Sequence, residues 1–102
     1  MIEEFETILQ SKPLTLVAFY TDWFELCKKQ SPIVEDIADE LGEMIKVITI
    51  DVEKFPQLAR YYSIQAVPTI ILFKKAEMQF KKAGIMSKPQ ILSIIFQHKE
   101  QI

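Results

Sequence analysis

The chain has 102 residues, which is enough for one domain and too few for two, so we expect a single domain over residues 1–102. Hydrophobic residues make up 49% of the chain and charged residues 25%, which is typical of an ordinary folded domain rather than a disordered one. The formal net charge is −2 and the lysines are scattered among acidic residues, which argues against a nucleic-acid partner.

The sequence also argues against a membrane partner. The start, Met1–Glu6, is acidic and lacks the basic and apolar regions of a signal peptide. The longest apolar runs, near Leu14–Tyr20 and Ile70–Phe73, are too short to cross a bilayer. We therefore expect a cytoplasmic protein.

The chain has a single cysteine, Cys27, which excludes an intramolecular disulfide and a cysteine-based metal cluster. We expect neither a metal nor a cofactor.

Apolar spacing predicts a helix, a buried strand and a long helix in the first part of the chain. Residues 2–10 place their apolar side chains on one helical face. Leu14–Tyr20 is rich in β-forming residues and apolar almost throughout, which is typical of a central strand covered by helices. The long helix is expected from about Phe24 to Leu41, where an apolar stripe repeats at helical spacing.

Local signals mark the two ends of this long helix. Asp22 or Thr21 is expected to cap its N-terminus, and Glu25, three residues after Asp22, suits a capping box. Gly42 provides a natural C-terminal stop. Pro32 falls inside the helix and should kink it, because proline removes one backbone hydrogen bond.

The remaining elements complete an alternating pattern of strands and helices. We expect a second strand at Met44–Val52, a short helix from Pro56 to about Tyr62, strands at Ala66–Lys74 and Met78–Lys82, and a last helix capped by Ser87. The first two strands should be parallel and the last two antiparallel, with Lys81 and Lys82 discouraging other chains from pairing at that edge. The whole predicts an α/β fold with helices on both faces of the sheet.

The junction between the first strand and the long helix holds the only tryptophan, Trp23, and the only cysteine, Cys27. Such a junction places side chains near a helix N-terminus, where free N–H groups and the helix dipole favour negative charge. A thiolate is a charge of this kind.

The order of these features resembles the thioredoxin family over about residues 5–100. The shared features are Trp23 with Cys27 and Lys28 after it, Pro32 in the following helix, Ile50-Asp51, Val67-Pro68-Thr69 before an apolar strand, and Gly84. The resemblance implies a thioredoxin-like fold and a cis peptide at Val67–Pro68. The first strand of the usual five has no counterpart, so we expect four strands, with Met44–Val52 at an edge.

The window that should carry the chemistry departs from the family pattern. The family motif is Trp-Cys-Gly-Pro-Cys-Lys, and this chain has Trp23-Phe24-Glu25-Leu26-Cys27-Lys28. Phe24 stands where the attacking cysteine should be, and Cys27 corresponds to the resolving one. Ala18 and Val47 replace a buried aspartate and its lysine partner. Dithiol exchange needs two thiols, so we expect that the chain cannot complete the cycle alone.

Two functions fit this degenerate motif, and whether the protein is an enzyme stays open. In the first, the protein binds a polypeptide partner through a groove at Val67–Pro68, formed with Trp23, Phe24 and Gly84. Phe24 could either flank this groove or fill it. In the second, Cys27 acts as a single thiol in cell redox homeostasis, resolved by glutathione or by a partner protein's thiol.

Burial should make Cys27 a weak nucleophile, so we expect an inert side chain inherited from a redox ancestor. The alternatives are the single working thiol and an intermolecular disulfide. A further hypothesis is a homodimer formed through the edge strand at Met44–Val52.

Overall fold

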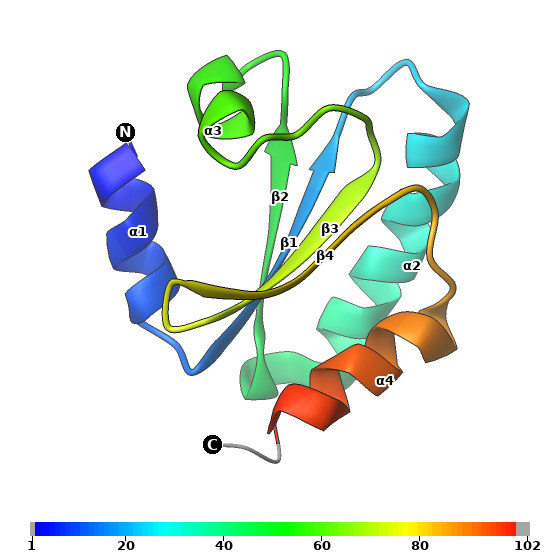
Figure 1. The fold of residues 1–102 in the computed structure, drawn as a ribbon. Coiled ribbons are helices and arrows are strands. Elements are labelled where there is room, and N and C mark those ends of the chain that lie inside the picture. The colour runs from blue at the N-terminus through cyan, green and yellow to red at the C-terminus, as the bar shows by residue number, and fades with distance from the viewer. Residues whose placement is uncertain (1, 100–102) are drawn as a thin grey trace.

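The structure is a computed structural model, and it describes residues 2–99. Its sheet has four strands in the order β2-β1-β3-β4, and helices cover both faces (Figure 1). The elements are α1 (Ile2–Gln10), β1 (Leu14–Tyr20), α2 (Glu25–Leu41), the 3-10 turn η1 (Gly42–Met44), β2 (Lys46–Asp51), α3 (Pro56–Tyr61), β3 (Thr69–Lys74), β4 (Glu77–Ala83) and α4 (Lys88–Lys99). The predicted order of elements and the four-stranded mixed sheet are confirmed.

The central position of β1 explains why its sequence is apolar on both sides. It pairs with β2 in parallel and with β3 antiparallel, and all its residues from Leu14 to Phe19 are buried. Phe19 lies opposite both Ile50 and Thr69. The ends of β1 and β2 therefore meet the start of β3 at one end of the sheet, which we call the Thr69 end.

The core consists of two apolar clusters separated by the sheet. Alternate residues of β1 point to opposite faces, so Leu16 and Ala18 join one cluster while Val17 and Phe19 join the other. The first cluster packs against α2 and α4, and the second against α1 and α3. In the second, the ring of Tyr62 contacts those of three phenylalanines, and burial raises the pKa of its hydroxyl to about 12.

The N-terminus of α2 differs from the prediction, because neither Asp22 nor Thr21 caps it. Phe24 occupies the N-cap position and provides no side-chain hydrogen bond to the helix. The backbone carbonyl of Phe24 accepts the N–H groups of Cys27 at 3.0 Å and Lys28 at 3.2 Å. The capping box with Glu25 is therefore wrong, and the helix begins at Glu25 instead of Phe24.

Other differences concern the lengths of elements and the role of one lysine. β2 and β3 are shorter than predicted, because Gly42–Met44 forms a 3-10 turn and residues 66–68 precede the sheet pairing. Lys81 is not simply an edge charge, since its ammonium donates to the carbonyls of Tyr62 at 2.9 Å and Ser63 at 2.8 Å. Carbonyl groups at a helix C-terminus interact favourably with a cation. The two hydrogen bonds from Lys81 therefore hold β4 to the end of α3.

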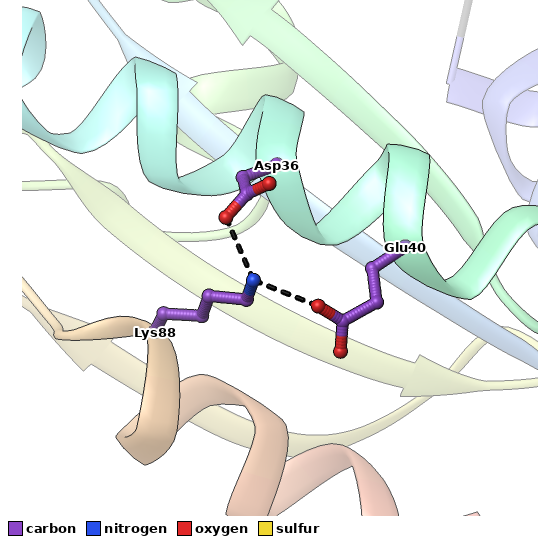
Figure 2. A network of polar contacts seen from close by, with 3 residues as sticks. All are labelled: Asp36, Glu40 and Lys88. Atoms are coloured by element: carbon purple, nitrogen blue, oxygen red, sulfur yellow. Dashed lines mark hydrogen bonds and ion pairs between the residues drawn. The ribbon is translucent and has the colours of Figure 1, made fainter.

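The start of α4 agrees with the prediction. The Gln90 N–H donates to Ser87 Oγ at 3.3 Å, and the Ser87 N–H donates to Gln90 Oε1 at 2.9 Å, which is a reciprocal capping box. Lys88 then joins α4 to α2, because its ammonium lies 2.7 Å from a carboxylate oxygen of Asp36 and 2.8 Å from one of Glu40 (Figure 2). Together these contacts fix the chain that follows Gly84.

Candidate functional site

Five of the six residues predicted to form a site lie on loops at the Thr69 end of the sheet, and the sixth, Cys27, lies in the first turn of α2. The chain leaves β1 at Tyr20, enters β3 at Thr69 and leaves β4 at Ala83, and the register places these points together (Figure 1). The Gly84 N–H donates to the Pro68 carbonyl at 2.8 Å, which extends the β3–β4 pairing by one step. The structure therefore brings Pro68 and Gly84 into direct contact.

A buried glutamine that was not among the predicted site residues holds α2 against the segment after Gly84. Gln30 is 2% exposed, and its side-chain amide donates to the Met86 carbonyl at 3.0 Å. Its amide oxygen accepts the Met86 N–H at 2.7 Å. Gln30 lies on the same helical stripe as buried Cys27 and Val34, and a polar side chain in an apolar stripe was the signal that could have found it.

Trp23 is fixed along one edge of its ring and remains open to solvent elsewhere. Its side chain is 65% exposed, and its indole N–H donates to a carboxylate oxygen of Glu53 at 3.0 Å. Glu53 is positioned in turn by its own N–H, which donates to Asp51 Oδ1 at 2.9 Å. The half-buried ring of Phe24 meets Trp23 edge-to-face, with 5.9 Å between the ring centroids.

Cys27 is buried in the first turn of α2, with 1% of its surface exposed. Its carbonyl accepts a hydrogen bond from Ser31 Oγ at 3.0 Å, while Lys28 points to Glu25 on the exposed side of the helix. Ala18 is buried in the first apolar cluster, and Val47 packs against that cluster. The two positions where the family pattern has charged side chains are therefore apolar and belong to, or pack against, the first cluster.

A polar hollow of about 230 Å³ reaches Cys27 from the side of α2. It is lined by Tyr20, Thr21, Asp22, Cys27, Lys28, Ser31, Pro32 and Glu35. Of the six residues predicted to form a site, only Cys27 lines this hollow. The hydroxyl of Thr21 is buried beside it and forms no hydrogen bond within residues 2–99.

The turn before β3 leaves a short piece of backbone available for pairing. The Val67–Pro68 peptide bond is cis, Val67 is half-buried and Pro68 is buried. The Thr69 hydroxyl donates to the Ala66 carbonyl at 2.6 Å and holds the turn. Within residues 2–99 the Val67 N–H and carbonyl have no hydrogen-bond partner, so the N–H can donate to an added peptide and the carbonyl can accept from it.

Two exposed apolar side chains, absent from the predicted set, extend the surface around this turn. Leu26 is exposed on the first turn of α2, and Ile85 is 41% exposed directly after Gly84. Leu26 and Gln30 share a helix face because they are four positions apart, and Gln30 bonds the residue that follows Ile85. Leu26 and Ile85 therefore belong to the same region as the predicted residues.

Among residues 2–99, no group of three or more histidine, cysteine, aspartate or glutamate side chains is placed to hold a metal ion. None of the helices in that range is long and apolar enough to cross a membrane.

Comparisons with known proteins agree with the fold and the motif order. The family model for thioredoxin matches residues 2–97. The thioredoxin of Buchnera aphidicola subsp. Baizongia pistaciae is 42% identical over 84 residues, covering 82% of this chain and 77% of the relative. The thioredoxin of Acidithiobacillus ferridurans is 34% identical over 94 residues, covering 91% and 87%.

A solved thioredoxin structure has the same fold as this chain. A mutant thioredoxin from Halobacterium salinarum superposes with a TM-score of 0.88 at 27% sequence identity, over 98% of this chain and 87% of that one. The resemblance therefore extends across the sheet, the helices and the loops at the Thr69 end. This chain belongs to the thioredoxin family.

Proposed function

We propose that this protein is a polypeptide-binding member of the thioredoxin family that does not complete a dithiol–disulfide cycle by itself. The observation that carries the proposal is that Cys27 is the only cysteine and is almost fully buried, while the half-buried Phe24 stands at the position of the attacking cysteine. The surface at the Thr69 end carries exposed apolar side chains and the unpaired backbone groups of Val67. Binding is the function that this arrangement supports without a second thiol.

The chemistry of disulfide reduction explains why one thiol is insufficient. A thiolate attacks a substrate disulfide, forms a mixed disulfide and releases one substrate thiolate. A second thiolate in the same chain must then attack the mixed disulfide, forming an internal disulfide and releasing the other substrate thiolate. Cys27 has no second cysteine in the chain to perform this step.

The binding surface combines backbone groups with apolar side chains. An extended peptide can add to exposed backbone, as strand-addition modules do, by pairing with the N–H and carbonyl of Val67. Trp23, Leu26 and Ile85 are exposed around it and supply apolar contact area. Tryptophan is among the residues that contribute most to binding energy at protein interfaces, which makes Trp23 the expected anchor.

Disulfide reduction tests the redox half of the proposal. With insulin as substrate and dithiothreitol as electron donor, we expect the protein to add nothing to the uncatalysed rate. The variant Phe24→Cys restores a second thiol in the motif and should gain measurable activity. Phe96→Cys, which makes the same change at an exposed position on α4, should gain none. A wild-type rate comparable to that of a two-cysteine thioredoxin would contradict the proposal.

Tryptophan fluorescence tests the binding half, because Trp23 is the only tryptophan in the chain. Titration with a tryptophan-free unfolded polypeptide, such as reduced and carboxymethylated ribonuclease A, should change the Trp23 emission in a saturable way. Ile85→Ser should weaken this binding roughly fivefold, because it removes about 1 kcal/mol of apolar contact.

Ile8→Ser is the matched control for this titration. Ile8 is also 41% exposed, but it lies on α1, away from the Thr69 loops. Equal affinities of the two variants, or the absence of saturable binding by the wild type, would contradict the binding proposal.

A second candidate function uses Cys27 as a single thiol, and the polar hollow beside it favours this alternative. A small disulfide such as oxidised glutathione would be attacked by the Cys27 thiolate, forming a protein–glutathione disulfide and releasing one glutathione thiolate. The test is the rate of alkylation of native Cys27 by iodoacetamide from neutral to alkaline pH, compared with the unfolded chain. A thiol that is inert when folded and reactive only when unfolded would exclude this function.

A further inference from the structure

The two edges of the sheet differ in how well they are protected against pairing with another chain. The β4 edge carries Glu77, Lys81 and Lys82, and its pairing with β3 is interrupted by an irregularity between Leu72 and Phe73. Charges and bulges are the usual devices that prevent edge-to-edge association. The β2 edge has its charged residues only at the ends of the strand, and the four residues 47–50 between them are uncharged.

The direction of the β2 backbone groups follows from one hydrogen bond. The Val52 N–H donates to the Tyr20 carbonyl at 3.0 Å, so residue 52 faces β1. Backbone groups alternate sides along a strand, and residues 46, 48 and 50 therefore also face β1. The N–H and carbonyl of Val47 and Thr49, and the N–H of Asp51, point to the open edge. The Asp51 carbonyl already accepts the N–H groups of Lys54 and Phe55.

An apolar hollow adjoins this open edge on the face that carries α1 and α3. It measures about 350 Å³ and is lined by Glu4, Phe5, Ile8, Ile48, Ile50, Phe55 and Leu58. Ile8 and Phe55 are exposed there, and Ile48 is half-buried. An added strand would thus meet both free hydrogen-bonding groups and apolar side chains.

We propose that β2 pairs antiparallel with β2 of a second copy of this chain, with Thr49 opposite Thr49. In this register the two Thr49 residues exchange both backbone bonds, and each Asp51 N–H donates to the Val47 carbonyl of the other copy. A twofold axis through two antiparallel strands requires that one residue lie opposite the same residue of the other copy. The pairing of Thr49 with Thr49 satisfies this requirement.

The side chains fit the same register. Ile48 of one copy lies opposite Ile50 of the other, so the two apolar hollows join across the interface. The two Thr49 side chains face each other on the opposite side of the sheet, and paired threonines are favourable cross-strand neighbours. If the strands were instead paired with Ile48 opposite Ile48, Lys46 of one copy would lie opposite Ile50 of the other. The two Thr49 residues would then no longer exchange backbone hydrogen bonds. The edge is therefore complementary to itself, which identifies a second copy as the occupant.

Measurement of the molar mass across a range of protein concentrations tests the proposal, for example by sedimentation equilibrium. The wild type should shift from monomer to dimer as the concentration rises. Thr49→Pro removes an N–H that faces the open edge and does not bond β1, so the monomer should keep its fold by circular dichroism. Two interchain bonds are lost per dimer, and the dissociation constant should rise by roughly thirtyfold.

Ala83→Pro is the matched control at the other edge. Because Gly84 bonds Pro68, the neighbouring Ala83 N–H points away from β3, and its loss should leave the dimer unchanged. A charge swap tests the register itself: Thr49→Lys and Thr49→Glu should each be monomeric alone and should form a mixed dimer when combined. A wild type that stays monomeric at every concentration, or a Thr49→Pro variant that dimerises like the wild type, would overturn the proposal.

Discussion

The variant Gln30→Met tests how strongly the buried glutamine holds α2 to the segment after Gly84. Methionine keeps the length and apolar stem of the side chain but removes both hydrogen bonds to the backbone of Met86. The N–H and carbonyl of Met86 then stay buried without a partner. Leaving a buried polar group unsatisfied costs about 1–3 kcal/mol, and two groups lose their partner, so we expect a loss of about 2–6 kcal/mol in the free energy of unfolding.

Urea unfolding followed by circular dichroism measures this loss, and a shift of the midpoint at constant slope would identify it as lost stability. The expected change is a large part of the 5–15 kcal/mol that stabilises a typical domain. Gln97→Met is the matched control, because Gln97 is exposed on α4 and its replacement should change stability by less than about 0.5 kcal/mol. If Gln30→Met were as stable as Gln97→Met, the reasoning that Gln30 fixes the segment after Gly84 would be refuted.

Three further predictions concern charge, pH and backbone conformation. Hydrogen bonds to Asp36 and Glu40 raise the pKa of Lys88, so Lys88→Met should lower the unfolding midpoint in low salt and less in high salt. Burial raises the pKa of Tyr62 to about 12 from the usual value of 10.0. The unfolded chain therefore loses this proton first, and the stabilising contribution of Tyr62 should be complete below pH 10 and lost as the pH rises through about 12. Tyr62→Phe should remove that part of the alkaline pH dependence in urea titrations, and an unchanged profile would contradict it. Gly84 has a φ of +95° with no atom within 4 Å of an added Cβ, so Gly84→Ala should cost about 1–2 kcal/mol through backbone strain alone, measured by thermal unfolding.

The fold could be predicted because its signals are local and agree with one another. The apolar run at Leu14–Tyr20 requires burial on both faces, and only a central strand between two helical layers provides that. The Ser87 cap and the stop at Gly42 depend on residues within a few positions of the helix ends, and the structure places both helix ends there. The order of the motifs then identified one family.

The contacts that shape the site could not be predicted, because their partners are distant in the sequence. Gln30 bonds a residue 56 positions away, and Trp23 bonds Glu53, 30 positions away. The predicted cap of α2 was wrong for a related reason. Thr21 has a suitable side chain, but it is buried at the end of β1 and lies three residues before the N-cap that the chain adopts at Phe24. Local preference named residues that can cap a helix, but the path of the chain placed Phe24, which cannot cap, at the N-cap.

The division of the core by the sheet has a consequence for how substitutions combine. Val17 and Ala18 are neighbours in sequence, yet their side chains contribute to different clusters on opposite sides of β1. Stability losses add when two altered sites share no contacts and interact when they do. Pairs of changes taken one from each cluster, such as Ile37→Val with Phe5→Leu, should therefore be additive. The two halves of the core can then vary independently while β1 between them stays constant.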